Sequence, residues 1–208
     1  MTTLEILAMT AFFATINRLK YIQRWGLKRN SSNENVKEHS FDVCVIAHLL
    51  CAIKNEFFGA SIDPGEVVLA ALYHDAHESI TGDLPTPIKK FNQGIYETYK
   101  EIESLASIAL VETLPEELKD DLHNYVTESC DAPITELVKA ADTISAYIKC
   151  LEEIQSGNHE FKDALEDIEK RLDKIDLPEV AYFRKHFLPA VYLTVDELYA
   201  AQRQEQIP

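Results

Sequence analysis

The sequence predicts an all-α fold, a single helical bundle of roughly eight helices. Apolar residues recur at intervals of three and four through most of the chain, which is the period of an amphipathic helix. No segment of convincing length alternates apolar and polar residues, and no glycine-rich phosphate-binding motif or internal repeat is present. The length of 208 residues suits one domain with a sizeable core, and we assign residues 1–208 to it.

The first half of the chain contains four predicted helices. Asn35 and Glu38 have the spacing of a capping box at the start of the second helix. Asp63 followed by Pro64 marks the start of the third. Gly94 is a weak point in the fourth, which is long and amphipathic. These helices are expected over residues 4–22, 35–53, 63–78 and 85–114.

The second half of the chain contains four more predicted helices. Each opens on or near a proline or an acidic residue, as helix starts often do. They are expected over residues 115–126, 132–155, 160–175 and 177–193.

The distribution of charge disfavours one class of partner. A net charge of −15 argues against binding of long nucleic acids, whose phosphates attract basic surfaces. Residues 17–38 are an exception, because six basic residues stand there against two acidic ones. A basic island in an acidic protein suits a small anionic ligand. A solvated basic loop is the simpler alternative.

The sequence carries no sign of a membrane or export segment. No apolar run approaches the length that spans a bilayer, and the N-terminus lacks a signal-peptide pattern. We therefore expect a cytoplasmic protein that does not bind membranes. The four cysteines have no CxxC spacing, and Cys44 and Cys51 lie on one helical face. Reduced thiols are expected rather than disulfides or a zinc site.

Ionisable side chains crowd the end of an apolar helix in YHDAHE, residues 73–78. On an ideal helix, Glu78 falls between His74 and Asp75 on one face, and His77 lies at the margin. Imidazole nitrogen and carboxylate oxygen together suit a borderline divalent metal ion. Two adjacent ligands are too few for such an ion, so further ligands must come from other helices.

Two other residues offer such ligands. His39 lies one turn into its predicted helix, and Asp142 lies on an otherwise apolar face, where an unpaired carboxylate would be costly. A histidine, an adjacent His-Asp pair and a distant aspartate are the pattern typical of the HD-domain metal-dependent phosphohydrolases. The chain resembles this superfamily, with its motif core at about residues 35–147.

The resemblance extends to a narrower family. The segments NRLKYIQRWGLKRNSSNENVKEHS, YHDAHESITGDLPTPIKKFN and LVKAADTISAYIKCLEE look like those of the bacterial 5′-deoxynucleotidases, with shorter matches in ETYKEIE, PEEL and GNHEF. The likeness covers almost the whole chain. It implies a phosphoric monoester hydrolase that converts a deoxyribonucleoside 5′-monophosphate to deoxynucleoside and phosphate. It also implies a homodimer.

The same resemblance implies a metal centre. The ligands of one divalent cation would be His39, His74, Asp75 and Asp142. Glu78, beside them, would be the catalytic carboxylate, which orients or deprotonates water or protonates the leaving 5′-oxygen. Such an ion lowers the pKa of bound water and neutralises phosphoryl oxygens. Mixed histidine and carboxylate ligation accepts Co²⁺, Mn²⁺, Mg²⁺ and similar ions, so the sequence does not name the metal.

Two loops would bind the substrate in this family. Arg24 and Trp25 match its Arg-Trp pair, which selects deoxyribose. An arginine grips phosphate through its planar donor group, and a rigid indole against C2′ leaves an added hydroxyl without room. The second loop would offer Asp83, Leu84, Pro85 and Thr86 to the nucleotide.

His77 departs from the family pattern, which has a small polar residue at this position. Its imidazole could contact a phosphate or help to hold a second metal ion. A supporting or surface side chain is the simpler interpretation.

Two other functions stay open at this point. The same scaffold serves triphosphohydrolases that release triphosphate from a deoxynucleotide, including phage-type enzymes that favour dATP, and the basic island could bind one phosphate or three. The other alternative is a non-catalytic nucleotide-binding HD module. Such a module is expected to lose a metal ligand or the acid, and this chain keeps all of them.

Overall fold

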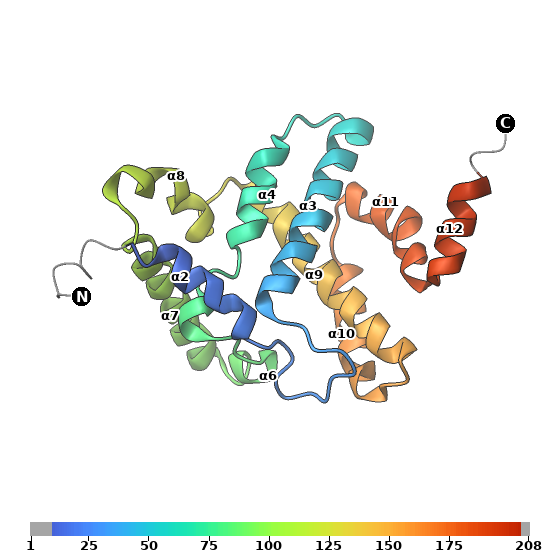
Figure 1. The fold of residues 1–208 in the computed structure, drawn as a ribbon, viewed down its shortest axis with the longest axis horizontal. Coiled ribbons are helices and arrows are strands. Elements are labelled where there is room, and N and C mark those ends of the chain that lie inside the picture. Colours follow the sequence, from blue (N-terminus) through green and yellow to red (C-terminus); the bar gives the residue numbers. More distant parts are fainter. Residues whose placement is uncertain (1–9, 205–208) are drawn as a thin grey trace.

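The computed structural model describes residues 10–204 and confirms the all-α prediction (Figure 1). The only extended pairing within this range is an isolated bridge between Gln23 and Asn35. None of the described helices has the length and apolar character needed to cross a membrane. The helical segments, in chain order, are α2 (Phe12–Ile16), η1 (Asn17–Tyr21), α3 (Val36–Phe58), α4 (Pro64–Tyr73), α5 (Glu78–Thr81), α6 (Thr86–Lys89), α7 (Gln93–Val111), α8 (Glu116–Val126), α9 (Ala132–Gln155), η2 (His159–Phe161), α10 (Lys162–Leu172), α11 (Pro178–His186), η3 (Leu188–Tyr192) and α12 (Val195–Gln204).

The main core lies between α3, α4 and α9, with α10 and α11 packed around it (Figure 1). Leu50, Ala71 and Ile144 are fully buried in it. A second, smaller cluster contains Ala76 and Leu110. Ala71 and Ala76 belong to different clusters, so packing fixes the chain on both sides of His74 and Asp75.

The prediction of one helix over residues 63–78 was wrong at its C-terminal end. α4 ends at Tyr73, and a turn follows before α5 begins at Glu78. In this turn the Ala76 N–H donates to the Tyr73 carbonyl, and the Glu78 N–H donates to the Asp75 carbonyl. Each bond spans three residues rather than four, so the angular spacing of an ideal helix does not apply to the candidate metal ligands.

Two other predicted helices are also divided. The segment 85–114 separates into α6 and α7 because Asn92 caps α7, accepting a hydrogen bond from the Ile95 N–H at 2.9 Å. The segment 177–193 separates into α11 and η3, with Pro189 just after the break. Proline lacks the N–H that would continue an α-helix.

Several helix starts were predicted correctly. The capping box of Asn35 and Glu38 is formed, with both hydrogen bonds present. Asp63 caps α4 through a 2.7 Å hydrogen bond from the Gly65 N–H. α9 has the predicted bounds, whereas α3 runs on to Phe58 rather than ending at Ile53.

The ends of the described chain differ from the prediction. Residues 4–9 of the first predicted helix lie outside the described residues, and the rest forms α2 and the 3-10 helix η1. α12, at one end of the molecule in Figure 1, was not predicted. Thr194 and Glu197 form a capping-box arrangement at its start, a signal that the sequence does contain.

A buried carboxylate fastens the loop before α3 to α9. Glu153 is 2% exposed. Its carboxylate accepts hydrogen bonds from the backbone N–H groups of Ser31 and Ser32, at 2.8 and 3.2 Å. The Asn158 amide donates to it at 2.7 Å, and the Lys149 ammonium completes the set. Burial opposes ionisation, but these donors lower the pKa of Glu153 to about 2.

We predict that Glu153→Gln lowers the free energy of unfolding by about 3 kcal/mol, because Lys149 is left as a buried charge without its partner. Urea denaturation at pH 7 measures the loss, and the exposed Glu166→Gln serves as the control. The folded-state pKa lies below the ordinary value of 4.5, so the stabilisation is present above pH 4.5 and disappears as the pH falls toward 2. An equal stability of variant and wild type at pH 7 would contradict this account.

Candidate metal site and substrate loops

His39 is fully buried near the start of α3. Its Nε2 lies 3.1 Å from Oδ1 of Asp142 on α9 and 3.6 Å from Oδ2 of Asp75. The other ring nitrogen, Nδ1, lies 3.1 Å from the Ser145 hydroxyl. With Nδ1 donating to this hydroxyl, the lone pair sits on Nε2, which faces the two carboxylates.

His74 directs its own Nε2 to the same place. It is the C-cap residue that follows α4, and its Nδ1 donates to the Ala71 carbonyl at 2.8 Å. A carbonyl oxygen can only accept, so Nδ1 carries a proton, and loss of the second proton would leave the lone pair on Nε2. This Nε2 lies 3.1 Å from Asp75 Oδ2, and the His74 and His39 ring centroids are 5.2 Å apart.

Asp75 connects the residues of this cluster. Besides the two histidines, its Oδ2 faces Arg24, whose terminal nitrogen lies 3.5 Å away. Burial opposes ionisation of Asp75, but the charges of His74, His39 and Arg24 hold its pKa well below the ordinary value. Burial likewise opposes a charged His74, and the Asp75 carboxylate outweighs it, which raises the His74 pKa to about 9.

The donor set fits a divalent metal ion. One ligand atom each from His39, His74 and Asp142 lies within 4.8 Å of the others. Within the described residues, no hydrogen bond reaches Nε2 of either histidine, although both atoms are buried. Buried nitrogen atoms without partners are costly, and a cation among them and the carboxylates would satisfy both. Asp142 is 46% exposed in its side chain, so the cluster opens toward solvent on that side.

A second group, made of Asp75, His77 and Glu78, adjoins the first. Its ligand atoms also lie within 4.8 Å of one another. The prediction that His77 lies at the margin of a helix face was wrong, because the chain is not helical at this residue. The interpretation of His77 as a surface side chain was also wrong, because the residue is only 4% exposed. Its two ring nitrogens lie 3.6 Å from a Glu103 oxygen and 3.8 Å from a Glu128 oxygen.

Glu78 is almost completely buried, and its Oε2 makes no hydrogen bond within residues 10–204. Its Oε1 lies 3.9 Å from the Lys89 ammonium. Burial, together with the negative charges of Asp75 and Asp83, raises the Glu78 pKa to about 9. A carboxyl group in this environment holds a proton at neutral pH and can donate it.

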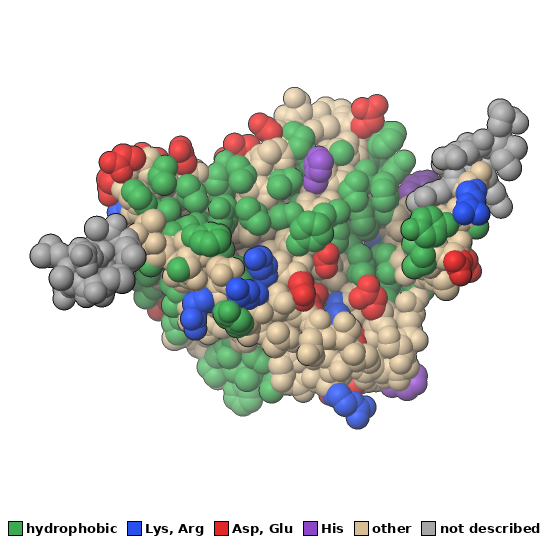
Figure 2. Space-filling model, in the orientation of Figure 1, with side chains coloured by type: hydrophobic (Ala, Val, Ile, Leu, Met, Phe, Trp, Pro, Cys, Tyr) green, Lys and Arg blue, Asp and Glu red, His purple; other side chains and the backbone are tan. Residues whose placement is uncertain are grey.

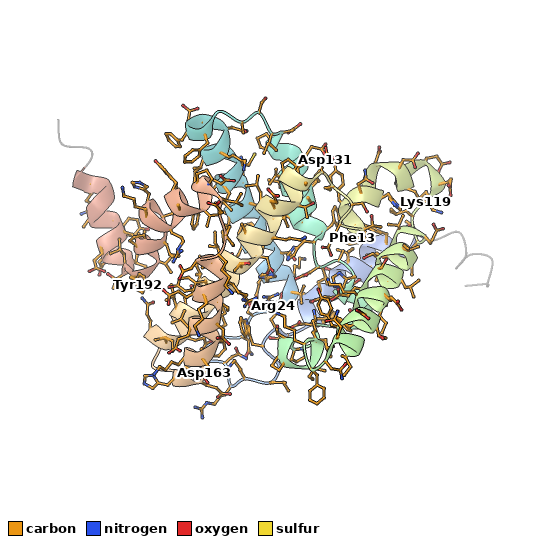
Figure 3. The ribbon with its side chains drawn as sticks, turned by 180° about the vertical axis from the view of Figure 1, so that it is seen from behind. Phe13, Arg24, Lys119, Asp131, Asp163 and Tyr192 are labelled. Atoms are coloured by element: carbon orange, nitrogen blue, oxygen red, sulfur yellow. The ribbon has the colours of Figure 1, made fainter. Side chains whose placement is uncertain are left out.

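Arg24 and Trp25 lie on the loop between η1 and α3. Figure 3 shows Arg24 near the centre of the molecule rather than at its rim. Its side chain joins this loop to the candidate metal site, since Nε pairs with Glu34 at 3.0 Å and a terminal nitrogen lies 3.5 Å from Asp75. Trp25 is partly buried, and its ring packs on Phe161 with the centroids 5.3 Å apart.

The rest of the basic island does not reach the cluster. Lys28 donates to the Glu160 carbonyl at 2.8 Å, and the Arg29 N–H donates to the Glu160 carboxylate. These contacts fasten the loop to η2. Of the six basic residues in 17–38, Arg24 is the one that contacts a candidate ligand within the described structure. Arg24 is therefore the residue of the basic island that is placed to meet an anion at the cluster.

The loop 83–86 follows α5 directly. Burial raises the pKa of Asp83, while the nearby charges of Arg24 and Lys89 oppose this rise, so Asp83 lies close to the candidate site. Leu84 and Pro85 are partly buried, and Thr86 is exposed at the first residue of α6. Within residues 10–204, no hydrogen bond or ion pair joins these three side chains to the cluster.

Three residues of the site were missed by the sequence argument. Ser145 lies three positions after Asp142 on α9, a spacing that puts both on one helix face and could have revealed it. Glu34 reaches the site from the loop before α3, and Lys89 reaches it from the end of α6. No local sequence pattern signals either contact.

Comparison with solved structures agrees with this fold. An HD-domain phosphohydrolase from Listeria innocua superposes with a TM-score of 0.77 at 22% identity, covering 86% of this chain and 87% of that one. An HD phosphohydrolase of cyanophage S-2L, described as bound to dA and one catalytic Zn²⁺ ion, gives a TM-score of 0.59 at 21% identity, covering 87% and 96%. At these identities the likeness concerns the fold alone.

Comparison of sequences is more specific. Residues 11–191 match the family model described as 5′-deoxynucleotidase YfbR-like. A 5′-deoxynucleotidase from Vibrio cholerae is 46% identical over 188 residues, which cover 90% of this chain and 97% of that relative. The chain therefore belongs to the YfbR-like 5′-deoxynucleotidase family.

Proposed function

We propose that this chain hydrolyses deoxyribonucleoside 5′-monophosphates to deoxynucleoside and phosphate, using one divalent cation. Family membership gives the reaction class, since the relatives are named 5′-deoxynucleotidases. The main support for the site is the pair of buried Nε2 atoms of His39 and His74, which face carboxylates and have no hydrogen-bond partner among residues 10–204.

The residues that would hold the cation are His39, His74, Asp75 and Asp142. When bound, a divalent cation would neutralise charge on the phosphoryl oxygens, which favours attack by water on the phosphorus. The Ala71 carbonyl and the Ser145 hydroxyl hold the two imidazole rings in orientation. Zn²⁺, which the cyanophage protein contains, joins Co²⁺, Mn²⁺ and Mg²⁺ as a candidate ion.

Glu78 is proposed as the residue that moves the proton. Its raised pKa keeps a proton on the carboxyl at neutral pH, and cleavage of the ester leaves a 5′-oxygen that needs one. A cation beside Asp75 would oppose the rise in the Glu78 pKa, so the Glu78 carboxyl can also return to the carboxylate form during the catalytic cycle. The Lys89 ammonium, 3.9 Å away, also favours the carboxylate form of Glu78.

The two loops are proposed to bind the nucleotide. Arg24 faces the cluster and would pair with the phosphate, and Trp25 would pack against C2′ of the sugar. In the second loop Asp83 is partly buried near Arg24, and Leu84, Pro85 and Thr86 would complete the wall of the pocket.

A product-resolved assay separates this function from the triphosphohydrolase and from the non-catalytic module. Purified protein with Co²⁺, Mn²⁺ or Mg²⁺ is incubated with dAMP, AMP and dATP, and phosphate and triphosphate are measured separately. We expect phosphate from dAMP, little from AMP, and no reaction in EDTA. Exclusive release of triphosphate from dATP would overturn the proposal, and inactivity with every nucleotide and metal would favour a binding module.

The role of Glu78 is tested by Glu78→Gln. The variant keeps the shape of the side chain but has no acidic proton, so we expect kcat to fall by about 10³-fold. Metal content, measured by mass spectrometry of the metal, should stay at one ion per chain, as in the exposed control Glu101→Gln. Loss of the ion together with activity would show instead that Glu78 is a ligand.

We also propose that two copies of the chain form a homodimer through the exposed face of α3 and α4. Figure 2 shows hydrophobic side chains gathered over these helices. The exposed hydrophobic residues there include Phe41, Val45, Leu69 and Leu72. A contiguous apolar surface of this kind is typical of a protein interface.

The dimer proposal predicts that Phe41→Glu, which places a charge in this face, yields a monomer. Light scattering after gel filtration measures the mass of wild type and variant. Leu105→Glu, an equally exposed position on α7, should leave the mass of two chains unchanged. A wild-type mass of one chain would reject the proposal.

A further inference from the structure

We propose that Glu34 is a positioning residue, which orients Arg24 and Trp25 through a single carboxylate oxygen. The inference rests on the roles proposed above for these two residues. It adds that phosphate binding and the choice of deoxyribose depend on the same hydrogen-bond acceptor, so neither can be changed alone at this position.

The geometry is direct. Oε2 of Glu34 accepts a hydrogen bond from Arg24 Nε at 3.0 Å and a second one from Trp25 Nε1, also at 3.0 Å. Both the Glu34 and Arg24 side chains are nearly buried, with 11% and 13% exposed. A hydrogen bond shielded from water and made to a charged group is stronger than an exposed one. The contact therefore has the strength to fix both side chains.

The backbone holds Glu34 opposite its two partners. The Arg24 N–H donates to the Glu34 carbonyl at 2.9 Å, and the neighbouring residues Gln23 and Asn35 form the isolated bridge. The Val36 N–H donates to the Ile22 carbonyl at 3.0 Å. These hydrogen bonds hold the two ends of the loop together, residues 22–24 against residues 34–36, and so keep Glu34 next to Arg24.

The backbone conformation of Trp25 makes the hydrogen bond to Glu34 especially important for this residue. Its φ of 60° lies in the left-handed region, which a bulky side chain enters only when the surroundings hold it there. Packing on Phe161 supports the ring, and Glu34 holds the indole N–H. Without that hydrogen bond the ring would be free to leave the orientation that excludes a 2′-hydroxyl.

The Arg24 guanidinium contacts two carboxylates, those of Glu34 and Asp75. Glu34 accepts the hydrogen bond from Nε, and one terminal nitrogen, Nη1, lies 3.5 Å from Asp75 in the candidate metal site. A guanidinium is planar, so fixing Nε fixes the direction of the whole group. A phosphate beside the cluster would therefore meet an arginine that is already oriented, which lowers the entropic cost of binding.

Steady-state kinetics on dAMP and AMP test this inference, with kcat and KM measured for wild type and four variants. In Glu34→Ala we expect KM for dAMP to rise, and the ratio of kcat/KM for dAMP over AMP to fall, each by about tenfold. Glu34→Asp, whose carboxylate is one methylene further back, should lose part of both. Glu34→Gln, whose amide oxygen can still accept two hydrogen bonds, should keep more of the ratio than Glu34→Ala. Glu38→Gln, an exposed neighbour, should keep it fully.

Fluorescence provides a readout that does not need activity, because Trp25 is the only tryptophan in the chain. Emission in Glu34→Ala and Glu34→Asp should become more sensitive to quenching by acrylamide than in wild type and Glu38→Gln. Altered quenching in a protein that does not hydrolyse dAMP would reject the proposed function and keep the positioning role. An unchanged ratio and unchanged quenching in a folded Glu34→Asp or Glu34→Ala protein would overturn the inference.

Discussion

The candidate site is organised around one atom, Oδ2 of Asp75. It lies within 3.6 Å of imidazole nitrogens from His39 and His74, and 3.5 Å from the Arg24 guanidinium. These groups come from α3, from the loop directly before it and from the end of α4, so a single carboxylate links the end of α4 to the segment that precedes and begins α3. A charged oxygen in a partly buried position is tolerated only with such partners, and this requirement constrains all three segments.

The break in helix after Tyr73 makes that arrangement possible. In a continuous helix, His74 and Asp75 would point 100° apart, whereas the turn allows Asp75 to face both histidines while Glu78 stays buried beside it. The same turn divides the ionisable groups by environment. Asp75 is held ionised by cationic neighbours, and Glu78 is driven toward its protonated form by burial and by the negative charge next to it.

The sequence was sufficient for the helical architecture, for several caps and for the set of residues that meet in the cluster. Asp63 caps α4 through a local rule, and the His-Asp pattern predicted which side chains gather. The sequence did not reveal the turn after Tyr73, because the helical period of apolar residues continues through the turn. The break in the helix accompanies the packing of Ala76 into the second cluster. Glu34 was missed for a related reason: its partners meet it only after the loop closes. The burial of His77 depends likewise on neighbours from distant segments.

We propose that one divalent cation lies between α3, the end of α4 and α9. Anomalous diffraction from crystals grown with Co²⁺ tests it most directly, because the signal locates the ion among the ligands. We expect one peak per chain, at about 2.1 Å from Nε2 of His39 and of His74, with Asp75 and Asp142 oxygens completing the set. A peak bounded by His77 and Glu78 instead, or no ordered peak at either group, would contradict it.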